Sequence, residues 1–346
     1  MVMNNKDRTI QILSSFSFMM LIFISIINPQ NHSILYHFFT WLTWPTIFFI
    51  AGYSIDVNLK IGQSIFLAVK RYLVPYLSAG LLMIVMNKVV QLLQLSTWLN
   101  TPFPAMRTGL KALLYGNGSP VVTIFGFFDT GIGLLWLLIA LFTGTLLMIF
   151  ISKIKKMFWA VLIIILLGGL GFYLATFIQI PWSLESALIA LPFMLFGVYY
   201  QKLDNWSAGP ATVLAALIVD LTMSASTGLD MIVAYTPFGI LGTLTGLISL
   251  AGVIVVASSL TKNSALTNLF AKIGSYLSLN LVVFIFINTM IPINNYIGGL
   301  LPTGMLSFII IWLIMLIIST VIKFGLVKIL KTFSGQEGEL DEKVFK

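Results

Sequence analysis

The chain has 346 residues, of which 59% are hydrophobic and 9% are charged, and its mean hydropathy is +1.02. A soluble domain carries about 25% charged residues, so this composition excludes a soluble globular protein and predicts a chain that lies mostly in a membrane. The net charge is +8 and cysteine is absent, which excludes disulfides and thiolate chemistry. The cations are scattered over short loops and form no single patch, so we expect no nucleic-acid partner.

Ten segments are candidates for membrane helices, each of which needs about 20 mostly apolar residues. They lie at 10–28, 34–55, 74–95, 132–151, 157–177, 184–200, 209–226, 233–258, 274–292 and 303–323. The first has no small-residue cleavage site after it, so we interpret it as a retained helix and not as a signal peptide. The sequence predicts an all-α, polytopic integral membrane bundle of about ten transmembrane helices. We expect a single transmembrane domain over 8–325 and a polar cytoplasmic tail over 326–346.

The loop cations predict the orientation of the bundle, because excess Lys and Arg mark cytoplasmic loops. With the N-terminus inside, only Lys88, Arg107 and Lys111 of the 19 basic residues fall outside the inner loops. This pattern favours an N-in, C-in topology, with inner cations that attract anionic membrane lipids.

The longest connection, 96–131, then lies on the outer side, and long loops in compact folds are often functional. We expect a short helix at 105–115 that lies in the membrane interface. We also expect Asp129 to cap the helix that follows. The spacing of Gly242 and Gly246 is typical of close packing between membrane helices.

Ionisable residues inside a membrane are costly, so they are functional candidates by default. Asp220 and Lys88 are two such residues, and we expect Asp220 either to be buried against a partner such as Lys88 or to face a wet cavity. Glu185 and Asp230 lie at outer helix ends, where the helix dipole favours a carboxylate in the first turn. None of these residues forms the paired constellation of a metal or hydrolase site, so we expect no metal.

Five different motifs follow one another along the chain. A run with Pro45, Phe48, Phe49, Gly52 and Tyr53 is followed by Lys70, Arg71, Pro75 and Tyr76, and then by the motifs at 133–142, 191–200 and 273–279. In order and spacing they resemble the acyltransferase-3 superfamily of multi-spanning membrane O-acyltransferases, which acylate surface sugars. The likeness covers about 8–323.

The resemblance implies transfer of an acyl group, expected to be acetyl, from cytoplasmic acyl-CoA to a hydroxyl of a cell-envelope polysaccharide. It places the protein in a bacterial plasma membrane, with no tightly bound cofactor. Lys70 and Arg71 are expected to bind the diphosphate of the donor, since Arg matches phosphate bidentately; the alternative is ordinary anchoring at the inner surface. Tyr53, Tyr76 and Trp136 are expected to line the cavity; for Trp136 plain packing is the alternative, and the favoured one of the two.

The chain departs from the family on its first span, where the family carries a basic residue and a His that is thought to act as base. Alignment by the distance to Gly52 puts Ser14 and Ser25 at those positions. A serine hydroxyl has no accessible pKa near 7, so it cannot serve as a general base, and it carries no charge to hold an oxyanion. His32 and His37 are the candidate substitutes. His37 is in helical register with Trp41, which favours an interfacial aromatic belt instead.

This departure leaves a second hypothesis open. The chain would then be a non-catalytic relative that acts as a transporter or assembly factor in surface polysaccharide biosynthesis.

Overall fold

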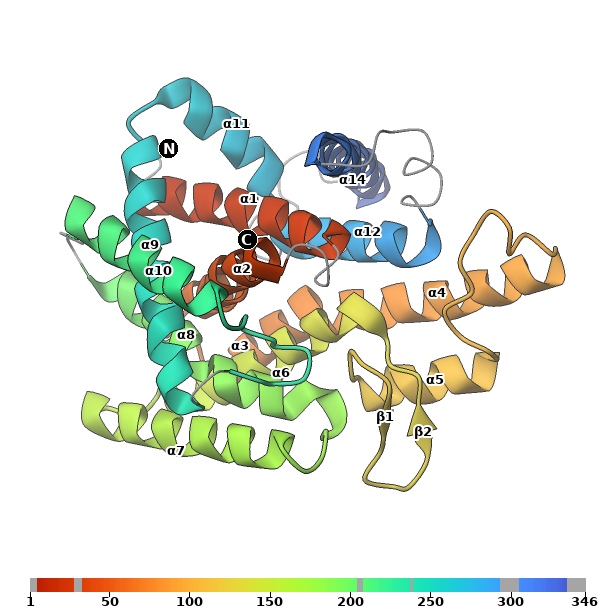
Figure 1. Cartoon of the computed structure of the whole chain (residues 1–346), viewed down its shortest axis with the longest axis horizontal. Helices are drawn as coiled ribbons and strands as arrows, with labels where there is room; N and C mark the ends of the chain where they lie inside the picture. Colours follow the sequence, from red (N-terminus) through yellow and green to blue (C-terminus); the bar gives the residue numbers. More distant parts are fainter. Residues whose placement is uncertain (1–4, 28–32, 204–207, 237–238, 293–304, 335–346) are drawn as a thin grey trace.

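The computed structural model describes residues 5–27, 33–203, 208–236, 239–292 and 305–334, and it shows an all-α bundle (Figure 1). Within these ranges, eight helices are long and apolar enough to cross a membrane. Two further helices form a pair bent by 61°, and the number of candidate spans is nine if this pair counts as one span. The prediction of an all-α, multi-pass membrane protein is confirmed.

The elements follow one another as α-helices with a single small sheet. The spans contain α1 (Asn5–Ile26), α2 (Ser33–Tyr53), α3 (Ile61–Ala68) with α4 (Val74–Leu92), α6 (Trp136–Ile151), α7 (Met157–Ala175), α8 (Leu184–Lys202), α10 (Ile240–Leu260) and α14 (Met305–Ser334). The bent pair is α11 (Ser264–Gly274) and α12 (Leu277–Met290). Shorter elements are α5 (Met106–Tyr115), α9 (Pro210–Ser224) and an antiparallel hairpin of β1 (Val121–Val122) and β2 (Phe128–Asp129).

The helix α2 is the centre of the bundle. It packs against α1, α6, α8, α9 and α10, and every residue from Thr40 to Gly52 is buried. Its contact with α8 is made backbone to backbone, because a Cβ on Gly52 would collide with the backbone of Met194 and a Cβ on Gly197 with that of Phe49. Glycine at both positions allows this close approach. The motifs that end α2 and α8 therefore form one interface.

The third span begins earlier than predicted. It runs over 32 residues, Ile61–Leu92, and joins α3 to α4 through a π-helix at Val69–Leu73, named η1. Pro75 therefore does not open a helix but is the second residue of α4. In the wider π turn, the N–H of Val74 donates to the carbonyl oxygen of Val69. The helix thus changes its hydrogen-bond register immediately before the proline, whose ring would otherwise disrupt a regular α-helix.

Other helix boundaries also differ from the prediction. The segment predicted at 209–226 is the 15-residue helix α9, which is too short to meet the length of a span. α10 starts at Ile240 and not at 233, because Asp230 and Tyr235 form a β-bridge before it. α14 continues to Ser334, so the first part of the predicted polar tail is helical.

The connection at 96–131, predicted to lie on the outer side, is more ordered than a simple loop. The helix predicted at 105–115 is confirmed as α5, and the sequence did not predict the hairpin that follows. Asp129 does not cap the next helix. Its Oδ1 accepts a hydrogen bond from the N–H of Gly131 at 3.2 Å, while Ile132 is the residue that precedes the 3-10 turn Gly133–Leu135. Figure 1 shows α5 and the hairpin beside α4, at one end of the molecule.

Candidate functional site

A cavity of about 600 Å³ lies between α1, the end of α2, η1 and the break between α11 and α12. Three of the residues singled out in the sequence, Ser14, Tyr53 and Arg71, line it. The other polar residues of its lining are Asp7, Gln11, Ser54, Asp56, Gln201, Ser275 and Tyr276. In the predicted topology this is the cytoplasmic side. The volume is in the range of small-molecule binding sites in proteins, about 300–1,000 Å³.

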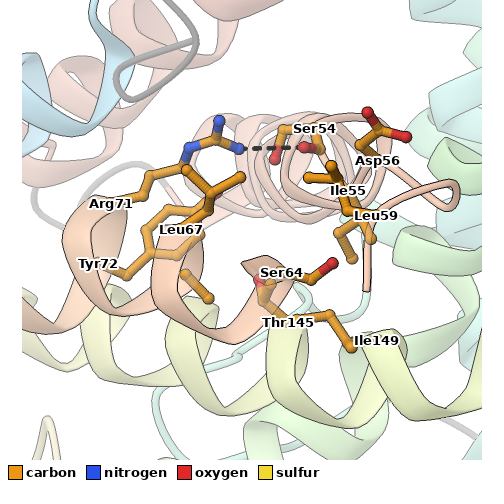
Figure 2. Close-up of a pocket in the computed structure, with 11 residues that line it drawn as sticks. Ser54, Ile55, Asp56, Leu59, Ser64, Leu67, Arg71, Tyr72, Thr145 and Ile149 are labelled. Atoms are coloured by element: carbon orange, nitrogen blue, oxygen red, sulfur yellow. Dashed lines mark hydrogen bonds between the residues drawn. The ribbon is translucent and has the colours of Figure 1, made fainter. Parts of the chain in front are cut away.

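Arg71 reaches this cavity from the π-helix. Its side chain is largely buried, with 8% exposed, and Nη1 donates to the carbonyl oxygen of Ser54 at 3.3 Å. Figure 2 shows the guanidinium extending toward Ser54 at the end of α2, with Asp56 just beyond it. The same side chain borders a second, much smaller pocket of about 20 Å³ on the α6 side, next to Thr145 and Ile149. The guanidinium is thus held between the C-terminal parts of α2 and α6, on the side predicted to be cytoplasmic.

Lys70 points elsewhere. It is exposed, and its Nζ lies 4.7 Å from the centre of the Phe66 ring. It is not among the residues that line either pocket. Adjacent residues on a helix do not face the same way, so the basic pair divides: Arg71 faces the cavity and Lys70 faces outward, where a cation fits ordinary anchoring.

The cavity lining carries charges of both signs, so only part of it favours an anionic ligand. Besides Arg71, the lining contains two carboxylates, Asp7 and Asp56, both of which are exposed. Two further cations bond to backbone around the cavity: Nζ of Lys6, at the start of α1, donates to the carbonyl oxygen of Gln201 at 3.4 Å, and Nζ of Lys153, after α6, donates to that of Leu59 at 2.8 Å. A ligand therefore meets one buried cation, exposed acids and neutral hydrogen-bonding groups.

The three aromatic residues expected at the cavity have different places. Tyr53 lines the cavity and its hydroxyl donates to Asp7 Oδ1 at 3.2 Å. Tyr76 is buried and its hydroxyl donates to the carbonyl oxygen of Leu113, which ties α4 to α5. Trp136 is fully buried and packs on Trp44, with ring centroids 5.6 Å apart. Neither Tyr76 nor Trp136 belongs to the lining of the two pockets.

The two serines of the first span bond within their own helix. The Ser14 hydroxyl donates to the carbonyl oxygen of Ile10 at 2.8 Å, and the Ser25 hydroxyl to that of Leu21 at 2.7 Å. His37 Nδ1 lies 3.1 Å from the carbonyl oxygen of Ser224 at the end of α9. His32 lies outside the described residues.

The buried acids are bound to groups of the protein. Asp220 does not pair with Lys88, which is exposed on α4; its Oδ1 instead accepts a hydrogen bond from the hydroxyl of Ser249 on α10. Glu185 lies in the first turn of α8, as predicted, and its Oε2 accepts the N–H of Ile180 at 3.1 Å. Burial raises the pKa of the Asp230 carboxyl, which the N–H of Ile232 partly offsets.

The sequence did not predict that the break between α11 and α12 forms one wall of the cavity. Tyr276, with φ of 57°, sits at the break, and Gly274–Leu277 line the cavity. Lys323 on α14 is fully buried, and its Nζ donates to the carbonyl oxygens of Lys272 at 2.8 Å, Ile273 at 3.1 Å and Ser275 at 3.4 Å. The cation satisfies carbonyl groups left by the end of α11. An isolated Lys in an apolar helix was the available signal, but it had been assigned to an inner loop.

Comparison with protein-family models, curated proteins and solved structures finds no match to this chain.

Proposed function

We propose that the chain is a membrane O-acyltransferase-like protein of a bacterial plasma membrane. It would take an acyl group, expected to be acetyl, from cytoplasmic acyl-CoA and transfer it to a hydroxyl of a cell-envelope polysaccharide. Arg71 is the residue proposed to hold the donor phosphate, because a guanidinium binds phosphate oxygens through two parallel hydrogen bonds.

The observation that carries this proposal is the shared cavity. Residues far apart in the sequence, Ser14, Tyr53 and Arg71, line one space of about 600 Å³ at the predicted inner face. Gln201 and Ser275 add neutral polar groups to the same lining. A cation beside neutral hydrogen-bonding groups suits a polar donor that carries both phosphate and amide groups. No general base is assigned, since both serines of the first span donate to their own helix.

The second candidate is a non-catalytic relative that transports or assembles surface polysaccharide. Two observations favour it. The serine positions hold no base, and the lining places Asp7 and Asp56 near the proposed phosphate site, where like charges would oppose an anion.

Binding and turnover of labelled acetyl-CoA by the purified full chain separate the two candidates. Binding with hydrolysis, or with transfer of label to a glycan, supports the enzyme. Binding without either reaction supports the non-catalytic relative, and absence of binding overturns the donor assignment.

The basic pair provides its own control. We expect Arg71→Ala to weaken acetyl-CoA binding about tenfold or more, because it removes a charge-assisted hydrogen bond. Lys70→Ala removes the same charge one residue away, and we expect the affinity to change less than about twofold because that ammonium faces outward. Titration with a fluorescent CoA analogue measures both. Equal losses in the two variants would contradict a specific role for Arg71.

A further inference from the structure

The outer unit, defined as α5 with the β1–β2 hairpin (residues 106–129), exposes an unusual amount of apolar surface. Its exposed large apolar side chains are Met106, Leu110 and Leu114 on α5 and Val122, Ile124, Phe125 and Phe128 on the hairpin. Leu114 is 71% exposed and Phe125 is 70% exposed. A surface that faces only water rarely carries such a group of side chains, so another phase or molecule covers it.

The helix and the hairpin form one packed piece. The Tyr115 ring meets the Phe125 and Phe127 rings edge to face, at centroid distances of 6.5 and 5.9 Å. Lys111 Nζ lies 4.9 Å from the centre of the Phe127 ring. The apolar tip of the hairpin is therefore held against α5 and belongs to the same surface.

The charge of the outer unit has one sign where it is exposed. Met106, Leu110 and Leu114 are spaced four residues apart, so they form one stripe along α5. Arg107 and Lys111 come directly after Met106 and Leu110 in the sequence. Arg107 is exposed and Lys111 is half-buried, whereas Asp129, the carboxylate of this segment, is buried. Apolar side chains flanked by cations are typical of helices that lie in a membrane surface.

Contacts with the spans set the level of this surface. Trp182 Nε1 donates to the carbonyl oxygen of Leu114 at 3.1 Å, and the Tyr115 hydroxyl donates to that of Gln179 at 2.6 Å. Gln179 and Trp182 lie between α7 and α8, so the end of α5 is level with the ends of two spans. Phe177 and Trp182, in the same connection between the spans, also expose their rings, and exposed aromatic residues at the ends of spans are typical of the membrane interface.

We propose that the outer unit is an interfacial anchor. The stripe of α5 and the hairpin tip insert into the lipid leaflet on that side, and Arg107 and Lys111 bind the phosphate of anionic lipid headgroups. The partner is the bilayer itself, because the patch continues the lipid-facing surface of the spans and its exposed charge is positive.

Because the chain has no cysteine, a single introduced cysteine can be labelled specifically, and its depth in the membrane can be measured. Phe125→Cys places one label site at the tip, Leu166→Cys on α7 provides a lipid-facing reference, and Asn58→Cys in the exposed α2–α3 loop provides a water-facing one. Each variant is labelled with a nitroxide and reconstituted in nanodiscs of phosphatidylcholine, or of phosphatidylcholine and phosphatidylglycerol in equal parts. Collision rates with oxygen and with an aqueous nickel chelate are then measured. We expect the label at 125 to resemble the label at 166, with high oxygen and low nickel accessibility.

The cations are tested at the same position. We expect phosphatidylglycerol to draw the label at 125 deeper, and Arg107→Gln with Lys111→Gln to abolish that response, since each cation strengthens binding to an anionic surface about fivefold. Lys155→Gln with Lys156→Gln, a charge-matched pair in the α6–α7 loop, should leave it intact. A label at 125 as open to nickel as the label at 58 overturns insertion. Protection from both reagents shows a protein partner or second copy instead, and a response that survives loss of both cations overturns the headgroup contact.

Discussion

Two contacts made by the first two helices differ in how they are held together. α2 meets α8 through glycine, with Gly52 and Gly197 set against the opposite backbone. α1 also meets the α11–α12 break at a glycine, since a Cβ on Gly274 would lie 2.5 Å from the carbonyl oxygen of Gln11, but a cavity opens beside this contact and Lys323 binds its wall. The first contact leaves no space for a side chain, whereas the second adjoins an open polar space. Rigid packing and an open polar site therefore adjoin each other, since Tyr53 of α2 and Gln201 of α8 also line the cavity.

The largest effect is expected at the glycine contact. Gly197→Leu places a side chain where the backbone of α2 already lies, so the helices must separate, at a cost of about 3 kcal/mol or more. Gly169→Leu on α7 is the matched control, because a Cβ there meets nothing within 4 Å. Thermal unfolding in detergent measures both variants. Equal stability of the two would show that α2 and α8 are not in backbone contact.

A smaller effect is expected at the cavity wall. Lys323→Met retains the length of the side chain but leaves three carbonyl groups without their cation, which should cost about 2 kcal/mol. We expect the α11–α12 break to become mobile, with faster amide hydrogen exchange at 272–277 than in the native protein. Lys328→Met, at an exposed position five residues further along α14, should leave that exchange unchanged. An unaltered exchange rate in Lys323→Met would contradict the view that Lys323 stabilises the α11–α12 break.

The smallest effect concerns a neutral partner of the same break. Asn280 Nδ2 donates to the carbonyl oxygens of Ile273 at 2.7 Å and Ser275 at 3.2 Å. Because Lys323 also binds these carbonyls, Asn280→Leu should cost only about 1 kcal/mol. In the double variant with Lys323→Met, we expect a loss larger than the sum of the single losses, since the carbonyls then have neither partner. Additive losses in unfolding experiments would mean that the two side chains act independently.

The apolar runs of the chain were sufficient to predict the class of fold and most of the spans. They were insufficient wherever the backbone leaves regular α-helix. The third span was predicted to begin at 74, next to Pro75, because the π turn at Val69–Leu73 that precedes this proline has no recognisable composition. Tyr276 adopts a positive φ although it is not a glycine, so its residue type did not indicate a helix break, and the broken helix beside the cavity was also not predicted.

The candidate site was predictable only in part, for a similar reason. Lys70 and Arg71 are equivalent in sequence, and only the direction of each side chain separates the one at the cavity from the one outside. Tyr53 and Tyr76 occupy comparable motif positions, yet one lines the cavity and the other fastens α5. Side-chain direction depends on packing between distant helices, which periodicity in one segment does not encode.

The continuous helix that carries Arg71 has a mechanical consequence. Its 32 residues extend over about 48 Å at 1.5 Å per residue, whereas the hydrocarbon core of a bilayer is about 30 Å thick. The surplus length must be taken up by tilt or by protrusion, and the depth of the guanidinium changes with either. Acyl-chain length in the host bilayer thus becomes a variable that sets where this charge stands.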